Sequence, residues 1–116
     1  MSNTVLIVDD SRVSRMMIRA IVLDAHPDWT ILEADNGDEA ISLAIGKSIQ
    51  HMILDYNMPG MNGLELADNL IGTHPDAQLT LLTANVQDSI RNRAQEIGVE
   101  FVSKPITDEK IRGIVN

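Results

Sequence analysis

Five short runs rich in aliphatic residues alternate along this chain with longer stretches in which apolar residues recur at helical spacing. Each run is too short for a helix, so we expect it to form a buried strand. Regular alternation of strands and helices predicts a parallel sheet with right-handed crossovers and helices on both faces, which is a doubly wound α/β domain. The predicted strands cover residues 5–8, 29–34, 52–54, 79–82 and 99–103.

Helices are expected between these strands and after the last one. Ser11 can cap the first helix and Pro27 closes it. The other predicted helices cover residues 38–45, 63–71, 85–97 and 107–115. The apolar residues expected to face the core are Val13, Met16, Met17, Ala20 and Ile21 in the first helix, Ala40, Ile41, Ala44 and Ile45 in the second, and Leu64, Ala67, Leu70 and Ile71 in the third.

The composition of the chain excludes several classes of functional site and binding partner. The chain has 116 residues, no cysteine and a formal net charge of −8. This length indicates one domain over residues 1–116. The absence of cysteine excludes disulfides, thiol catalysis and Cys-ligated metal sites. The negative charge argues against direct binding to nucleic acid phosphates. We find no secretory leader and no apolar run near the length of a membrane span, so we expect a cytoplasmic protein without membrane insertion.

Polar side chains follow four of the predicted strands. Asp9 and Asp10 come after the first strand, Asp55 after the third, Thr83 after the fourth and Lys104 after the fifth. Ligands of open parallel sheets bind outside the carboxyl ends of the strands. With the strand order 2-1-3-4-5, the first and third strands are neighbours, so we expect the three carboxylates to converge in one crevice.

This group of side chains suits phosphoryl transfer. Three close carboxylates repel one another unless a cation neutralises them. Oxygen ligands without Cys or His predict Mg²⁺, with Mn²⁺ as the alternative. We therefore predict that Asp55 is the nucleophile, that Lys104 and the metal neutralise the transferred group, and that Thr83 bonds a phosphoryl oxygen.

Each of these residues also has an ordinary structural explanation. Asp9 and Asp10 would be a favourable acidic pair at a helix start. Asp55 is typical of a turn, Lys104 of a solvated loop, and Thr83 of a helix cap. Their joint occurrence at successive strand ends favours the functional interpretation.

Five segments of the chain, in this order and spacing, resemble the receiver domain of two-component response regulators, and the single-domain chemotaxis type in particular. The resemblance covers the whole chain and implies the flavodoxin-like (βα)5 fold with the strand order 2-1-3-4-5. No site residue of the family is missing. The segments are residues 5–10 (VLIVDD), 33–40 (EADNGDEA), 55–63 (DYNMPGMNG), 82–84 (LTA) and 101–105 (FVSKP).

The resemblance assigns a role to each site residue. It implies that Asp55 is the phosphoacceptor, Asp10 the direct metal ligand and Asp9 its water-mediated neighbour. The carbonyl group of Asn57 would complete the metal set. Lys104 would be the phosphate-binding lysine.

The resemblance also implies a conformational switch. Thr83 matches the family's switch hydroxyl and Phe101 its switch aromatic, although plain core packing would also explain a lone Phe. In the family, these residues couple the phosphoryl group to a surface made here by residues 85–97, 99–103 and 107–115. Ala84 is small and should leave the phosphoryl group open to water, which predicts a labile signal.

The implied protein is a signalling switch and not an enzyme. A histidine kinase or histidine phosphotransfer protein would phosphorylate it, and the switched surface would control an effector protein, a fused output domain or a homodimer. Arg12, Arg15 and Arg19 are expected to form a solvated face of the first helix, with docking of an acidic phosphodonor as the alternative.

Other functions fit less well. A phosphorylation-independent protein-binding module is the alternative that we keep. An aspartyl-phosphate phosphatase needs an acid/base Asp where Asn57 stands. A flavin or nucleotide site needs a Gly-rich loop where Asp9 and Asp10 stand.

Overall fold

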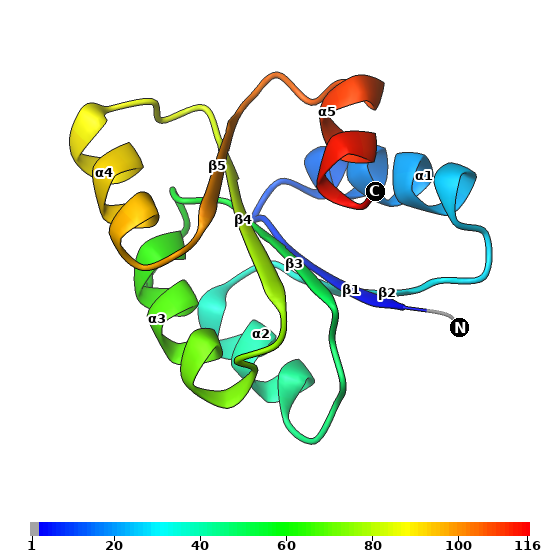
Figure 1. Ribbon diagram of the computed structural model, residues 1–116, viewed down its shortest axis with the longest axis horizontal. Helices are drawn as coiled ribbons and strands as arrows, with labels where there is room; N and C mark the ends of the chain where they lie inside the picture. Colours follow the sequence, from blue (N-terminus) through cyan, green and yellow to red (C-terminus); the bar gives the residue numbers. More distant parts are fainter. Residues whose placement is uncertain (1–2) are drawn as a thin grey trace.

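A five-stranded parallel sheet forms the centre of the computed structural model, which describes residues 3–116 (Figure 1). The strand order is β2-β1-β3-β4-β5, as predicted. Strands and helices alternate through β1 (Thr4–Val8), α1 (Arg12–Ala25), β2 (Thr30–Ala34), α2 (Gly37–Ala44), β3 (His51–Leu54), α3 (Gly63–Thr73), β4 (Gln78–Thr83), α4 (Asp88–Glu96), β5 (Glu100–Ser103) and α5 (Asp108–Ile114).

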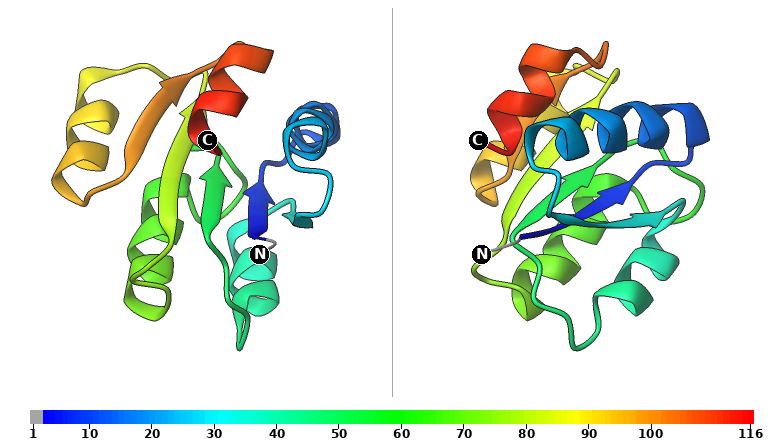
Figure 2. Two further views of the ribbon diagram at one scale, coloured as in Figure 1. Left: turned by 45° about the vertical axis from the view of Figure 1, so that its right-hand side comes forward. Right: turned by 90° about the vertical axis from the view of Figure 1, so that its right-hand side faces the viewer.

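Helices cover both faces of the sheet. Figure 2 shows α1 and α5 on one face and α2, α3 and α4 on the other. Side chains alternate between the faces along each strand, so Leu6 and Val8 of β1 join one core, whereas Val5 and Ile7 join the other. All four are fully buried. The continuous apolar run of β1 therefore reflects a strand that is covered on both sides.

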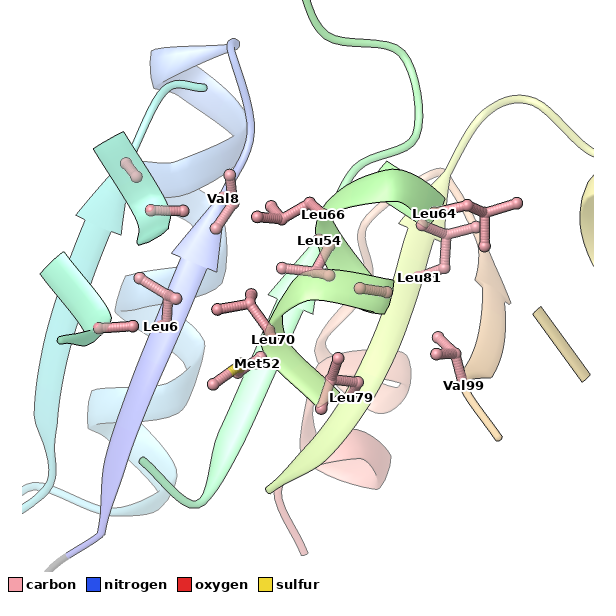
Figure 3. Close-up of a cluster of buried hydrophobic side chains, with 14 of the residues drawn as sticks. Leu6, Val8, Met52, Leu54, Leu64, Leu66, Leu70, Leu79, Leu81 and Val99 are labelled. Atoms are coloured by element: carbon pink, nitrogen blue, oxygen red, sulfur yellow. The ribbon is translucent and has the colours of Figure 1, made fainter. Parts of the chain in front are cut away.

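The larger core lies between the sheet and helices α2, α3 and α4. In Figure 3, Leu66 and Leu70 of α3 lie over Leu54 and Met52 of β3. The smaller core contains Ile18 and Val22 of α1 together with residues of α5 and the sheet. Burial of these aliphatic side chains is the main stabilising contribution to the fold.

The predicted inner face of α1 is wrong except at Ile21, which packs against the smaller core, and Ala20 is exposed. Val13, Met16 and Met17 are 66%, 57% and 44% exposed, and the helix buries Ile18 and Val22 instead. One helical turn before Ile18, the inward positions hold Ser14 and Arg15, because this end of α1 extends beyond the apolar core and over the polar edge of the sheet. Because polar residues occupy the inner face of this part of α1, its apolar residues lie on the solvent side, and the apolar pattern predicted the wrong face.

Two further expectations need correction. Ile45, expected in the core, is 75% exposed because α2 ends at Ala44 and the chain turns away. Helix α4 begins at Asp88 and not at residue 85, because β4 extends to Thr83 and a loop follows it. The N-cap prediction for Ser11 is confirmed, since its side chain accepts a hydrogen bond from the Ser14 N–H. Within residues 3–116, no helix is long and apolar enough to cross a membrane.

Candidate functional site

The predicted site residues meet at the carboxyl edge of the sheet. The backbone N–H groups of Asp9, Asp55 and Lys104 each extend the sheet by one hydrogen bond, to Ala34 O (3.1 Å), Val8 O (2.9 Å) and Thr83 O (2.9 Å), respectively. Each residue that follows a strand is therefore held by the neighbouring strand. The sheet itself sets the spacing between the functional side chains.

Three carboxylates form the centre of the site. Asp9, Asp10 and Asp55 each offer one oxygen, and these oxygens lie within 4.8 Å of one another. Asp9 and Asp55 are buried, whereas Asp10 is exposed. Asp9 Oδ1 accepts from the Ser11 N–H (2.9 Å) and Asp55 Oδ1 accepts from the Tyr56 N–H (2.7 Å), so each buried carboxylate is oriented by a local backbone group.

Lys104 joins the two buried acids. Its Nζ donates to Asp9 Oδ2 at 2.9 Å, to Asp55 Oδ2 at 3.3 Å and to Ser14 Oγ at 3.4 Å. Burial alone would lower the pKa of Lys104, but the contacts with Asp9 and Asp55 outweigh it and the pKa lies above its usual value. The lysine is therefore a fixed positive charge inside the acidic cluster.

The electrostatics of the cluster favour a cation. Burial raises the pKa of Asp9 above its usual value of 3.8, and the charge of Asp55 raises it further, against the opposing hydrogen bonds from Ser11 and Lys104. The cluster also holds three carboxylates against one lysine. Hard oxygen ligands, converging side chains and this residual negative charge all fit a divalent cation of the Mg²⁺ type.

Within residues 3–116, no hydrogen bond joins the side chains of Thr83, Asn57 or Phe101 to the three carboxylates. The Thr83 side chain is fully buried, and its Oγ1 accepts from the Asn85 N–H at 3.2 Å. Asn57 is exposed in the loop after Asp55. Phe101 is half-buried on β5, where it packs against the larger core.

The guanidinium carbon of Arg91 lies 4.7 Å from the centroid of the Phe101 ring. This contact ties the ring to α4 by a cation–π interaction. Phe101 also stands three residues before Lys104 in the chain, so strand β5 connects the ring to the acidic centre.

Gly63 starts a predicted helix and ends one of the family segments, but the sequence analysis gave it no role in the site. A Cβ atom at Gly63 would lie 2.1 Å from the carbonyl oxygen of Asp55. Gly63 also donates its N–H to Tyr56 O at 3.0 Å, which closes the loop after Asp55. Only glycine allows α3 to begin this close to the acidic residue.

Arg15 and Ser14 are the other residues that the sequence analysis missed. Arg15 was expected on a solvated stripe, but its side chain is only 15% exposed. Its Nη1 donates to the backbone carbonyl oxygen of Asp9 at 2.5 Å, and its Nε donates to Glu33 Oε1 at 3.2 Å. No local pattern marked these residues, since Ser14 contacts Lys104 and Arg15 contacts Glu33, which lie 90 and 18 positions away in the sequence.

Curated proteins with similar sequences are bacterial regulators. The sequence model of the response regulator receiver domain matches residues 5–116. The chain is 34% identical over 111 residues to the cyclic di-GMP phosphodiesterase response regulator RpfG of Xanthomonas campestris pv. campestris (strain 8004), covering 93% of this chain and 29% of that protein. It is 30% identical over 112 residues to the transcriptional regulatory protein SrrA of Staphylococcus aureus (strain NCTC 8325 / PS 47), covering 96% and 45%. The chain thus spans less than half the length of these curated relatives.

Solved structures share the fold. The chemotaxis response regulator CheY4 of Vibrio cholerae superposes with a TM-score of 0.87 at 24% identity, covering 99% of this chain and 97% of that one. The signal receiver domain of an HD domain-containing protein from Pseudomonas fluorescens Pf-5 has a TM-score of 0.90 at 21% identity, covering 99% and 92%. The structural likeness supports the topology, and the sequence match extends over nearly the whole chain. The chain belongs to the response regulator receiver domain family.

Proposed function

We propose that this chain is a phosphorylation-driven switch in which Asp55 accepts a phosphoryl group from a histidine kinase or a histidine phosphotransfer protein. The observation that carries the proposal is the contact of the Lys104 ammonium with Asp55 Oδ2 inside a cluster of three carboxylates. A carboxylate oxygen of Asp55 attacks the phosphorus of a phosphohistidine. A P–O bond forms as the P–N bond breaks, and the imidazole keeps the electron pair and takes up a proton.

Lys104 serves this transfer by its position. The ammonium group lies beside the attacking carboxylate, where it can follow the negative oxygens of the incoming group and stabilise them. Its bond to Asp9 holds the long side chain in place before the donor arrives. The buried setting strengthens both charge contacts, because little water screens them.

The metal site in this proposal consists of Asp9, Asp10 and Asp55 with the carbonyl oxygen of Asn57. The close carboxylate oxygens and the raised pKa of Asp9, caused first by burial, support a divalent cation there. Bound Mg²⁺, or Mn²⁺, would neutralise charge on the transferred group. Asp10 would bind the cation directly and Asp9 through water.

The proposed switch runs from Thr83 to Phe101. The Thr83 hydroxyl turns toward a phosphoryl oxygen and releases the Asn85 N–H that it now accepts from. Phe101 then moves inward and leaves Arg91, so that the surface of α4, β5 and α5 changes. That surface would act on an effector protein or an output domain, or form a homodimer.

The exposed side chains Val13, Met16 and Met17, which we call the α1 apolar patch, suggest where the phosphodonor docks. The patch lies on the helix whose Ser14 contacts Lys104, so a protein bound there can reach Asp55. Exposed apolar side chains beside a reactive group are typical of a protein-binding surface. We therefore assign the patch to the histidine-containing phosphodonor.

The chemistry can be tested by intact mass after incubation with acetyl phosphate, with and without Mg²⁺. We expect a gain of one phosphoryl group, about 80 Da, in the wild type only with Mg²⁺. Asp55→Asn should gain nothing, whereas Asp28→Asn, a matched change of an exposed acid in the α1–β2 loop, should behave as wild type. No gain under any condition would refute the proposal and leave the phosphorylation-independent binding module.

A further inference from the structure

Arg15 connects the β1–α1 turn to strand β2. Its Nη1 donates to the carbonyl oxygen of Asp9 at 2.5 Å and its Nε donates to Glu33 Oε1 at 3.2 Å. Arg19, one turn further along α1, reaches the other Glu33 oxygen at 3.4 Å but is 47% exposed. Arg15 is therefore the arginine of this stripe that bridges a site residue to the sheet, and we call the Arg15–Glu33 pair the β2 clamp.

The clamp completes the fixation of Asp9. The Asp9 N–H donates to Ala34 O, and Asp9 Oδ1 accepts from the Ser11 N–H. Lys104 Nζ donates to Asp9 Oδ2, and Arg15 binds the remaining polar group of this residue, which is its carbonyl oxygen. All four contacts act on the residue that leads directly into Asp10.

Asp10 depends on this fixation more than the other two acids. It is exposed, and within residues 3–116 no hydrogen bond holds its side chain. The Asp9 carbonyl belongs to the planar peptide unit that ends at the Asp10 Cα atom. The Ser11 N–H on the other side of Asp10 donates to Asp9 Oδ1, so the two contacts together hold the backbone from which the Asp10 side chain projects.

From this geometry we propose that Arg15 is a positioning residue for metal binding: it holds the Asp9–Asp10 peptide so that the exposed Asp10 carboxylate faces the cation. The inference rests on the proposed function, since it assumes that the acidic cluster binds a divalent ion. Arg15 makes no hydrogen bond to the side chains of Asp9, Asp10 or Asp55. It acts through the backbone carbonyl group of Asp9.

The positive charge of Arg15 allows a positioning role to be distinguished from an electrostatic one. A guanidinium near a cation site repels the cation, so removing its charge alone would tighten metal binding. Glu33 offsets that repulsion in the wild type. Removing the positioning contact would instead weaken binding, and the two mechanisms thus predict opposite signs for Arg15→Gln.

Titration with Mn²⁺, with free Mn²⁺ measured by electron paramagnetic resonance, separates these outcomes. We expect Arg15→Gln to bind Mn²⁺ about tenfold more weakly than wild type, at the lower end of effects seen when an outer-shell partner is removed. The loss should persist at high salt, because it comes from geometry and not from a screened charge. Arg19→Gln, which alters the same stripe without touching Asp9, should bind within about twofold of wild type under these conditions.

A folding measurement and a second variant keep the proposal testable if Arg15→Gln does not fold. Thermal unfolding in EDTA reports whether each protein is folded before metal is added. If Arg15→Gln does not fold, Glu33→Ala replaces it, since this change removes the acceptor of Arg15 Nε and should also weaken Mn²⁺ binding at high salt. Folded Arg15→Gln with equal or tighter Mn²⁺ binding would overturn the clamp alone. A wild type that does not bind Mn²⁺, or an Asp10→Asn variant that binds it equally well, would overturn the metal site and the clamp together.

Discussion

The Nζ atom of Lys104 lies closer to Asp9 Oδ2, at 2.9 Å, than to Asp55 Oδ2, at 3.3 Å. The lysine therefore contacts two of the three acids of the proposed metal site, and one of these is the proposed phosphoacceptor. Because like charges repel, Lys104 and a bound cation should oppose each other in the resting protein.

Replacing this lysine should accordingly separate metal binding from phosphorylation. We expect Lys104→Ala to bind Mg²⁺ about fivefold more tightly, since a positive charge leaves the cluster. Its phosphorylation by acetyl phosphate should slow by about 100-fold, the scale of losing one stabilising donor. Calorimetry and intact mass measure the two effects, and Lys47→Ala is the control because Lys47 is exposed in the loop before β3. Weaker metal binding in Lys104→Ala would contradict this view.

Burial of the Asp9 carboxylate should reduce the stability of the metal-free protein at neutral pH. The raised pKa of Asp9, caused mainly by burial, means that this residue favours folding below its ordinary pKa of 3.8. That contribution is lost as the pH rises through the higher folded-state pKa. At neutral pH in EDTA, Asp9→Asn should therefore unfold at a higher temperature than wild type.

Added Mg²⁺ should raise the unfolding temperature of the wild type but not of Asp10→Asn. Equal Mg²⁺ stabilisation of Asp10→Asn would argue against the proposed metal ligands.

A histidine far from the site should control stability in mild acid. His51 at the start of β3 is buried, its Nδ1 has no hydrogen-bond partner within residues 3–116, and it stacks on Trp29 with ring centroids 5.4 Å apart. Burial lowers the pKa of His51, with a smaller contribution from the charge of His26. The unfolded chain thus takes up this proton more readily than the folded one.

The stability associated with His51 should therefore be complete above its ordinary pKa of 6.5 and should decline as the pH falls through that value. Urea unfolding between pH 7.5 and 5.5, followed by the fluorescence of the chain's only tryptophan, measures the decline. His51→Phe should flatten this part of the pH dependence. An unchanged slope in His51→Phe would refute the assignment.

The start of α3 should tolerate no side chain at Gly63. Gly63→Ala would place a Cβ atom 2.1 Å from the Asp55 carbonyl oxygen, so we expect a loss of about 3 kcal/mol and slower phosphorylation. Gly72→Ala is a matched control in the same helix, because a Cβ atom there meets nothing within 4 Å. The control should gain about 0.5–1 kcal/mol through helix propensity. Urea unfolding measures both, and a Gly63→Ala protein of wild-type stability would contradict the close approach.

The α1 apolar patch should matter for a protein donor and not for a small one. Met16→Asp is expected to slow phosphotransfer from a phosphorylated histidine domain and to leave phosphorylation by acetyl phosphate unchanged. The folded protein should keep its stability, because Met16 is 57% exposed. Val86→Asp, which changes another exposed apolar residue in the loop before α4, is the matched control. Equal slowing with both phosphodonors would place the effect in the reaction chemistry and not in docking.

The main features of the fold and site were readable from local patterns. Strand-length apolar runs predicted the sheet, and the rule that parallel strands present their carboxyl ends at one edge predicted the meeting of Asp9, Asp10, Asp55 and Lys104. The same reasoning misplaced the inner face of α1, because Ser14 and Arg15 occupy inward positions over the polar site and broke the apolar stripe.

The sequence by itself therefore determined the class of fold and the acids at the strand ends, since short-range periodicity and the alternation of strands and helices decide these features. The strand order was implied by the resemblance to receiver domains. Only the tertiary structure decided which face of α1 is buried, that Ser14 reaches Lys104 across 90 positions of sequence, and that Gly63 presses against the Asp55 carbonyl. Such contacts depend on how whole elements pack at the sheet edge. No local pattern of residues encodes that packing.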